Sequence, residues 1–519
     1  MDVPVSETAS PRAGAREWLG LAVLGLPTLL VSVDASVLLL ALPHLSAQLN
    51  PTGTQMLWIV DIYAFFVAGF LITMGSLGDR IGRRRLLMIG GTAFAVASVL
   101  AAYSTGPEML IGARALLGLA GATLMPSTLA LITNMFRDAR QRTLAVSVWA
   151  ALFSSGLAIG PVVSGVLLEY FWWGSVFLIA VPIMALLLVC APLLLPEYRD
   201  DDAGKLDLIS VLLSLAAVVP VIYGVKELAA GGPATVSIAV SVAGLGLGYL
   251  FVRRQRMLEY PLLDLRLFAD RRFSAALGVL LVGVFVISGV FLLTTQQLQL
   301  VHGLAPLQAG LWLLPSAVAM ILTAMTATAL VQRVRIGYVV GGSLLLTAVG
   351  CLVLTQADVS SGLWILVVGL CIVFGGAGPM MALGTDLVVG SAPPERSGSA
   401  AAMSETAQEF GVAVGIALLG SIGSLVYRAQ LGGSLPAGLP ADAARAAEDQ
   451  LPAALAVAGR LPADMAGQVA AAAQTAFADG LNVVAGVSAA IGLVAASASL
   501  VLLRHVRSPH PDGEDVVAG

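Results

Sequence analysis

Charged residues are scarce in this sequence. Only 11% of its 519 residues are Asp, Glu, Lys or Arg, and 58% are hydrophobic, whereas a soluble protein has about 25% charged residues. So few charges cannot cover the surface of a water-soluble fold of this length, so an integral membrane protein is predicted. The net charge of −4 gives no indication of a nucleic-acid partner, because the basic residues are confined to particular loops.

Cysteine and histidine are also rare, and their placement argues against an enzyme. The three cysteines, Cys190, Cys351 and Cys371, lie unpaired in apolar stretches, which predicts neither a disulfide framework nor a metal site. The four histidines are scattered without the HExxH spacing of a zinc enzyme, and no Walker motif for ATP is present. The chain is therefore predicted to be no enzyme, to bind no metal and to need no cofactor.

Long apolar runs dominate what is present. A helix needs about 20 apolar residues to cross roughly 30 Å of hydrocarbon, and fourteen runs approach or exceed that length. The predicted cores are 18–42, 56–75, 86–103, 109–133, 144–168, 176–195, 208–225, 236–252, 273–293, 305–331, 337–354, 362–387, 399–426 and 483–503. The fold class predicted is all-α, with fourteen transmembrane helices.

The basic residues predict the orientation of these helices. With the N-terminus in the cytoplasm, alternate segments on that side hold 22 basic residues and the outer segments hold 4, which are Lys226, Arg428, Arg445 and Arg460. Cytoplasmic loops are enriched in Lys and Arg. Both termini are therefore predicted to be cytoplasmic in a multi-pass protein of the cell membrane.

Two halves of six helices are predicted, because many transporters pair such halves around a midplane site. The inner loop Gly75–Arg85, GSLGDRIGRRR, has a faint echo in Gln332–Gly337, QRVRIG. The loops correspond if the seventh and eighth helices are an insert. The expected divisions are an N-terminal tail (1–17), a first half (18–196), two inserted helices (197–252), a second half (253–503) and a C-terminal tail (504–519). Within the second half, the Ala-rich segment 428–480 is expected to lie outside and to form a short helical hairpin, with a break at Leu461–Pro462.

Acidic residues inside apolar runs are the first candidates for function. Asp34 lies in the first predicted helix and Asp61 near the outer end of the second. An ionisable group near the bilayer centre is costly, so it persists mainly where it faces a cavity, a partner or a cargo. Glu405 and Glu409, in the thirteenth helix, are four residues apart, which places them on one helix face about 6 Å apart along the axis. Two carboxylates this close in a low dielectric should not both stay ionised, as a proton-coupled carrier requires.

Arg114 in the fourth helix is the one basic residue expected inside the membrane. Four buried acids against one arginine predict a negative cavity. Its expected aromatic edge, made by Trp58, Tyr63, Phe65 and Phe66, would suit lipophilic cations. An ion pair or a position at the headgroup level remains the alternative for each acid.

Glycines mark two further motifs. In the inner loop, Gly75 and Gly82 allow a tight turn, while Asp79, Arg80 and Arg83 could form a charge cluster that latches the halves. In the fifth helix, GLAIGPVVSG places Gly156, Gly160 and Gly165 where close helix packing needs no side chain, and Pro161 removes a backbone donor.

These motifs resemble the fourteen-helix drug:proton antiporters of the major facilitator superfamily, over nearly the whole chain. VDASVLLLALP (Val33–Pro43) resembles their first-helix signature, GSLGDRIGRRR their loop motif and the fifth-helix glycines their antiporter motif. The resemblance links Arg114 to proton coupling, and the acids Asp61, Glu405 and Glu409 are similar to those of the quaternary-ammonium and multidrug exporters. Ser36 and Leu39 depart from the signature. The tenth helix also lacks an acid that some relatives have, which leaves the handling of divalent cations open.

The expected function is proton-coupled export of lipophilic, mainly cationic, drugs and antiseptics, driven by the proton gradient without a cofactor. Proton coupling is assigned to Asp34, Arg114 and Glu405, and cargo binding to Asp34, Trp58, Asp61, Tyr63, Glu405 and Glu409. A dedicated exporter of one secondary metabolite, giving self-resistance, remains the alternative. The partners expected are cationic small molecules, protons and the bilayer, with the protein a monomer.

Overall fold

The computed structural model describes residues 13–199, 207–229, 232–258, 261, 263, 265–331, 333–359, 362–391, 397–436 and 439–502. Every regular element in this part of the chain is helical. The predicted tails lie largely outside the described residues, as do Gln332 of the echo and Lys205.

The first half contains seven helices, of which the short α6 and α7 together replace one predicted span. They are α1 (Ala15–Leu49), α2 (Gly53–Ile81), α3 (Arg83–Ala102), α4 (Pro107–Met135), α5 (Ala139–Tyr170), α6 (Ser175–Leu178) and α7 (Ala180–Leu194). The second half contains α10 (Arg271–Gln296), the π-helical turn η2 (Gln297–Val301), α11 (Pro306–Val331), α12 (Ile336–Leu354), α13 (Leu363–Gly390), α14 (Ser397–Gly432) and α17 (Ala463–Leu502). A 3₁₀ turn, η1 (Leu267–Ala269), precedes α10.

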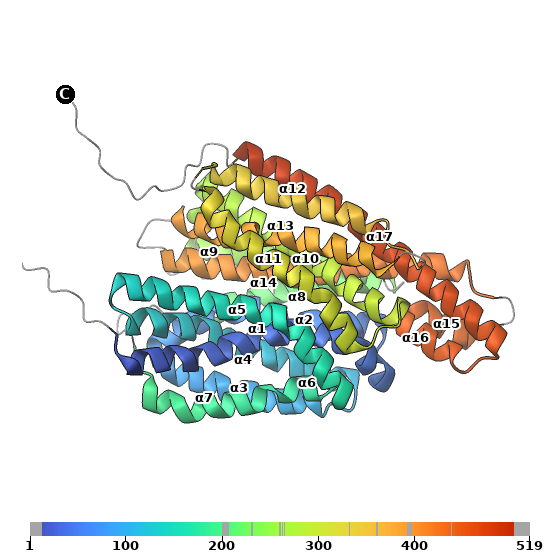
Figure 1. The fold of residues 1–519 in the computed structure, drawn as a ribbon, viewed down its shortest axis with the longest axis horizontal. Helices are drawn as coiled ribbons and strands as arrows, with labels where there is room; N and C mark the ends of the chain where they lie inside the picture. Colours follow the sequence, from blue (N-terminus) through green and yellow to red (C-terminus); the bar gives the residue numbers. More distant parts are fainter. Residues whose placement is uncertain are drawn as a thin grey trace, which may run out of the picture.

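The two halves pack their helices in the same pattern. In the first half α2 packs on α4, α3 on α4 and α1 on α5, and in the second half α11 packs on α13, α12 on α13 and α10 on α14. Figure 1 shows the halves as two stacked layers, with α1–α7 below and α10–α14 with α17 above. This correspondence makes α11 and α12 the counterparts of α2 and α3, as an insert of two helices requires.

Helices α8 (Leu208–Ala229) and α9 (Ala234–Met257) lie in the segment predicted to be an insert, and that division of the chain stays a prediction. They pack extensively against each other, and α8 also packs on α2 and α14, one helix from each half. Ile222 of α8 lies in a small apolar cluster with Phe65 of α2 and Ala413 of α14. The insert therefore joins the two halves through α8 rather than standing apart from them.

Thirteen helices in the described part of the chain are long and apolar enough to cross a membrane, and the chain is a multi-pass membrane protein. The predicted span missing from these thirteen is the fifth, 144–168, in α5, where the described residues provide two shorter apolar stretches, Leu144–Phe153 and Ile159–Tyr170. The number fourteen stays a prediction for this reason.

Two short helices, α15 (Ala441–Asp449) and α16 (Leu451–Ala458), follow α14. They lie at the end of the molecule opposite the start of α1 and the end of α17 (Figure 1). The break at Leu461–Pro462 separates α16 from α17, which then runs without interruption for 40 residues. The residues after the break are thus the start of α17 rather than a short second helix, and the hairpin consists instead of α15 and α16, both of which precede the break.

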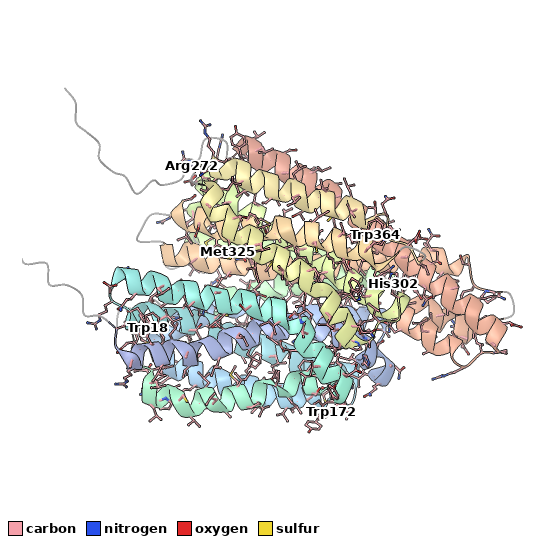
Figure 2. All side chains as sticks on the ribbon, viewed as in Figure 1. Trp18, Trp172, Arg272, His302, Met325 and Trp364 are labelled. Carbon is pink, nitrogen blue, oxygen red and sulfur yellow. The ribbon has the colours of Figure 1, made fainter. Side chains whose placement is uncertain are left out.

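Large aromatic side chains occur near both ends of the molecule. In Figure 2, Trp18 lies toward the same end as Arg272, while Trp172 and Trp364 lie toward the other end. Trp172 is 43% exposed and Trp364 63% exposed. Tryptophan is enriched at the two membrane interfaces, so these residues are placed as expected for a protein that spans a bilayer along this direction.

Candidate functional site

A buried ion pair joins the first and fourth helices. An Arg114 Nη on α4 lies 2.8 Å from an Asp34 carboxylate oxygen on α1, and the two side chains are 2% and 8% exposed. The Arg114 Nε also donates to the Ile59 carbonyl of α2 at 3.2 Å. Because breaking a buried pair by removing one partner is strongly destabilising, the pair ties three helices of the first half together.

Tyr63 of α2 packs against this pair. The Arg114 guanidinium carbon lies 4.6 Å from the centre of the Tyr63 ring, within cation–π range. Two glycines of α4 make the approach possible, because a Cβ at Gly118 would lie 2.4 Å from the Tyr63 carbonyl and one at Gly121 would lie 3.0 Å from its hydroxyl oxygen. The buried hydroxyl has no hydrogen-bond partner among the described residues.

Glu405 and Glu409 lie on α14, a helix of the second half that packs against α2 of the first half. Both side chains are partly buried, and neither makes an ion pair or a hydrogen bond within the described part of the chain. Glu409 lies within electrostatic reach of Tyr63, as do Asp34 and Arg114. Tyr63 is therefore near both the ion pair of the first half and Glu409 of α14.

Asp61 has a partner that the sequence analysis placed elsewhere. Its carboxylate lies 2.7 Å from the ammonium of Lys226 on α8, and both side chains are 0% exposed. The same ammonium lies 4.0 Å from the centre of the Trp58 ring. Counting Lys226 with the outer segments was wrong, because it lies in the last turn of α8 and points back into the protein.

The prediction of a cavity with four buried acids and a single basic residue is also wrong. Arg114 neutralises Asp34 and Lys226 neutralises Asp61. The aromatic edge is divided as well. Trp58, Asp61 and Phe65 recur at helical spacing on the face of α2 toward α8 and α14, whereas Tyr63 faces α4. Asp61 and Asp34 thus belong to two separate ion pairs rather than to one acidic site.

The fifth-helix glycines lie at two interfaces. Gly156 and Gly160 pack against Ser32 and Ser36 of α1, where an added Cβ would meet the serine hydroxyls. Gly165 instead faces the second half, and a Cβ there would lie 2.5 Å from the Leu307 Cα of α11.

Gly310 of α11 lies at the same contact between α5 and α11. A Cβ at Gly310 would lie 2.5 Å from the carbonyl oxygen of Pro161. The hydroxyl of Ser164 in the same motif donates to the Val37 carbonyl of α1 at 2.8 Å. The motif thus makes a close backbone contact between α5 and α11, and hence between the halves.

The loop motif between α2 and α3 forms ion pairs within the first half. Arg83 Nε donates to Asp79 at 2.7 Å, and Arg84 lies 3.4 Å from Glu197, which follows α7. Gly82 has a φ of +107°, a backbone conformation that favours glycine. The role of this cluster as a latch between the halves stays a prediction, because these pairs lie on one side only.

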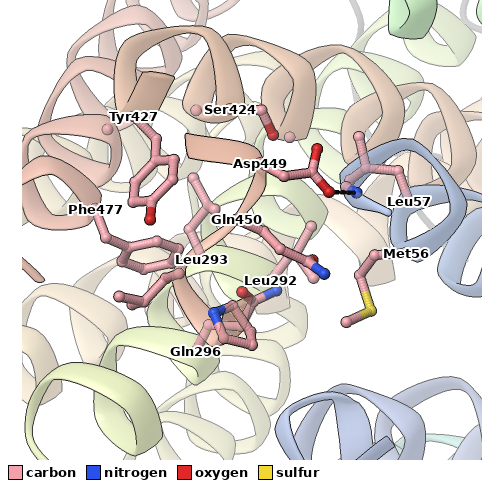
Figure 3. Close-up of a pocket in the computed structure, with 16 residues that line it drawn as sticks. Met56, Leu57, Leu292, Leu293, Gln296, Ser424, Tyr427, Asp449, Gln450 and Phe477 are labelled. Carbon is pink, nitrogen blue, oxygen red and sulfur yellow. Dashed lines mark hydrogen bonds between the residues drawn. The ribbon is translucent and has the colours of Figure 1, made fainter. Parts of the chain in front are cut away.

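A small pocket lies where the halves meet near α15 and α16 (Figure 3). Met56 and Leu57 of α2 line it from the first half, and Leu292 of α10, Tyr427 of α14 and Phe477 of α17 from the second. Asp449 accepts a hydrogen bond from the Gly53 amide at 2.9 Å, shown as the dashed line. The halves are thus in contact at this end of the molecule.

Two sets of helices with the same packing pattern, and paired and unpaired ionisable groups between apolar helices, are typical of a membrane transporter. No group of three metal-binding side chains occurs in the described residues. The chain belongs to the Major Facilitator Superfamily, because residues 24–416 match the sequence model of that family. The resemblance noted from the motifs is thereby confirmed, and the protein is a transporter rather than an enzyme.

Individual relatives cover nearly the full chain. It is 41% identical to the multidrug efflux pump LfrA of Mycolicibacterium smegmatis, over 96% of this chain and 98% of that protein. It is 36% identical to the methyl viologen resistance protein SmvA of Salmonella typhimurium, over 89% and 93% of the two chains. A bacterial homologue of the human lysosomal transporter Spinster, solved in an inward-facing and unoccupied conformation, has the same fold with a TM-score of 0.64 at 16% identity, covering 96% of this chain and 100% of that one.

Proposed function

We propose that this protein is a proton-coupled antiporter of the cell membrane that exports lipophilic cationic drugs from the cytoplasm. Both termini would then face the cytoplasm, and the end with α15 and α16 would face outward. The exporter would act as a monomer, with the proton gradient as its energy source and no cofactor.

The relatives support the direction of transport and the kind of cargo. LfrA carries the name of a multidrug efflux pump at 41% identity, and SmvA that of a methyl viologen resistance protein at 36%. Methyl viologen is an organic cation, which matches a transporter in which Glu405 and Glu409 have no cationic partner among the described residues. A drug exporter is therefore the function that these similarities favour.

The observation that carries the proposal is the line of ionisable groups from α1 to α14. Asp34 pairs with Arg114, Tyr63 lies against Arg114, and Glu409 lies within electrostatic reach of Tyr63. A proton on Asp34 would remove the charge that holds Arg114. The guanidinium would then be free to act on other groups, which links the protonation state to the packing of α1, α2 and α4.

The two unpaired carboxylates supply the cargo charge recognition. Glu405 and Glu409 have no cationic partner in the described part of the chain, and a buried charge without a partner is costly. A bound cation or a bound proton would relieve that cost, and the two cannot both neutralise the same carboxylate. This competition is the elementary requirement of exchange between a cationic drug and protons.

The test is ethidium transport in everted membrane vesicles under an imposed proton gradient. Wild-type vesicles should accumulate ethidium when the interior is acidified and release it when the gradient is collapsed. Asp34→Asn should abolish gradient-driven accumulation, whereas Asp442→Asn should leave it unchanged, because the Asp442 side chain is 92% exposed on α15. A folded Asp34→Asn protein that still concentrates ethidium would contradict the assignment of Asp34.

A dedicated exporter of one antibiotic is the second candidate. The chain is 28% identical to the tetracenomycin C resistance and export protein of Streptomyces glaucescens, over 98% of this chain and 96% of that protein. A panel of unrelated cations and neutral polyketides in the same vesicles separates the two. Gradient-driven transport of several unrelated cations supports the multidrug function, and transport of a single neutral or anionic compound supports the dedicated one.

A further inference from the structure

The fully buried ammonium of Lys226 has the surroundings of a bound organic cation. Asp61 supplies a counter-charge at 2.7 Å and Trp58 a ring face at 4.0 Å. A carboxylate and an aromatic face are also what a quaternary ammonium or phosphonium ion needs, because such ions carry no N–H donors and bind through charge and ring faces. Asp61 and Trp58 together form a cation subsite, and the side chain of Lys226 fills it.

The hydrogen bonding of this pair is poor for a purely structural ion pair. A lysine ammonium has three donors, yet the described residues offer Nζ one ion-pair partner, Asp61 at 2.7 Å, and no further hydrogen-bond acceptor. A buried pair offsets its desolvation only when further hydrogen bonds satisfy its remaining donors and acceptors. The arrangement therefore holds Lys226 less firmly than its burial suggests.

The position of Lys226 offers the ammonium a second place to go. Lys226 lies in the last turn of α8, three residues before the helix ends at Ala229. A lysine this close to a helix end can extend its stem toward the membrane surface and place its charge in water. The ammonium can thus leave the subsite without any movement of the α8 backbone.

The helices that carry the subsite also form the contact between the halves. α8 packs on α2 and on α14, and α14 carries Glu405 and Glu409. At the same contact, a Cβ at Gly420 of α14 would lie 2.8 Å from the Leu57 side chain of α2. A rearrangement of α2 against α14 during transport would change access to Asp61.

We propose that Lys226 and the cationic cargo are alternative occupants of the subsite formed by Asp61 and Trp58. The tethered ammonium fills the subsite when no cargo is present, and a lipophilic organic cation displaces it toward the surface at the end of α8. Lys226 is thereby a specificity-determining residue, because a cargo must compete with its charge. The inference rests on the proposed export of cations and adds a second cation subsite, apart from Glu405 and Glu409.

Chemical labelling of the wild-type protein tests the displacement directly. The chain contains two lysines, Lys205 and Lys226, so acetylation by a water-soluble N-hydroxysuccinimide ester can be followed at each by mass spectrometry. Saturating tetraphenylphosphonium, which has no amine to react, should raise acetylation of Lys226 several-fold relative to Lys205. Neutral triphenylphosphine oxide is the matched control and should not. Lys226 acetylation that stays constant or falls with the phosphonium ion would overturn the proposal.

Two variants test the competition by affinity. Lys226→Met removes the ammonium but keeps a stem of similar length, and tetraphenylphosphonium should bind it about tenfold more tightly, the gain expected from one additional charge and ring contact. Lys226→Met with Asp61→Asn replaces both charges with neutral groups, a change that buried pairs tolerate well, and should lose that gain. Equal affinity in the two variants would overturn the proposal even if Lys226→Met alone were too unstable for comparison with wild type.

Failure of the proposed role of Lys226 can be distinguished from failure of the proposed export function. If wild type binds no tetraphenylphosphonium and vesicles show no transport of it, cationic export itself is wrong. If wild type binds and transports the ion but Lys226 acetylation and the variant affinities do not respond, cation export stands and the Lys226 pair only fastens α8 to α2. Transport of the ion that does not depend on the proton gradient would contradict the coupling alone.

Discussion

Adding a methyl group to Gly310 should shift the protein away from the conformation described here. The added Cβ would lie 2.5 Å from the Pro161 carbonyl oxygen, whereas ordinary van der Waals contact begins at 3.4 Å. The α5 and α11 backbones must therefore separate by about 0.9 Å at this point. Overpacking of this kind costs roughly 1–3 kcal/mol.

The cost falls only on conformations in which α5 touches α11. A conformation in which the halves part at this end avoids it, so the substitution should change the ratio of the two by about 5- to 150-fold. Gly165→Ala should act in the same direction, because its Cβ would meet the Leu307 backbone at 2.5 Å.

Maleimide labelling of a single introduced cysteine measures the shift. The native cysteines Cys190, Cys351 and Cys371 are first replaced by serine, and Leu57→Cys then reports on the contact between α2 and α14 near Gly420. Gly310→Ala should raise the rate at which a membrane-impermeant maleimide labels this cysteine. The rise should be proportional to the increase in the population of the parted conformation.

Two control variants make the result specific. Gly278→Ala adds a methyl group where no atom lies within 4 Å and should leave the labelling rate unchanged. Gly156→Ala crowds Ser32 within the first half and should lower thermal stability without a matching rise in labelling. If Gly310→Ala and Gly278→Ala label at the same rate, the contact between α5 and α11 does not hold the halves together.

Three further predictions concern single side chains. Asp449→Asn removes the charge that accepts the Gly53 amide, so the same labelling assay should show a faster rate, and an unchanged rate would mean that the hairpin does not fasten the halves. Arg254, by donating a hydrogen bond, holds the pKa of Asp207 below its usual value, so the pair stabilises the fold above about pH 3.9 and this contribution is lost as the pH falls through the lowered pKa. Asp207→Asn should therefore lower the melting temperature less at pH 3 than at pH 7, and an equal deficit at both would contradict this interpretation. Tyr63→Phe removes a buried hydroxyl without a partner but keeps the ring beneath the guanidinium of α4, so the melting temperature of the purified protein should rise, and a fall would reveal a partner for the hydroxyl.

The sequence contained most of the architecture because membrane helices are defined by local composition. Apolar runs located the spans, and the spacing of four residues placed Glu405 and Glu409 on one face of α14. The fifth-helix glycines were recognised as packing positions from their pattern. Which helices they contact could not be read from it, because Gly165 meets Leu307 more than a hundred residues away.

The partner of Asp61 shows where sequence reasoning failed. Lys226 lies three residues from the end of α8, so assigning it to the following outer segment satisfied the positive-inside pattern. Nothing in a linear reading indicates that α8 packs on α2 and points this side chain toward Trp58. The one available signal was the isolated lysine at the end of an apolar run, which could face either the surface or a buried acid.

Helix α17 is long enough to extend beyond the membrane as a continuous helix. Its 40 residues extend about 60 Å, roughly twice the thickness of the hydrocarbon core, and α16 packs along it. The part beyond the membrane is thus one continuous rod with the span itself. A nanobody bound to the hairpin of α15 and α16 would report the tilt of the second half directly, and would give this small particle an asymmetric feature for alignment in electron microscopy.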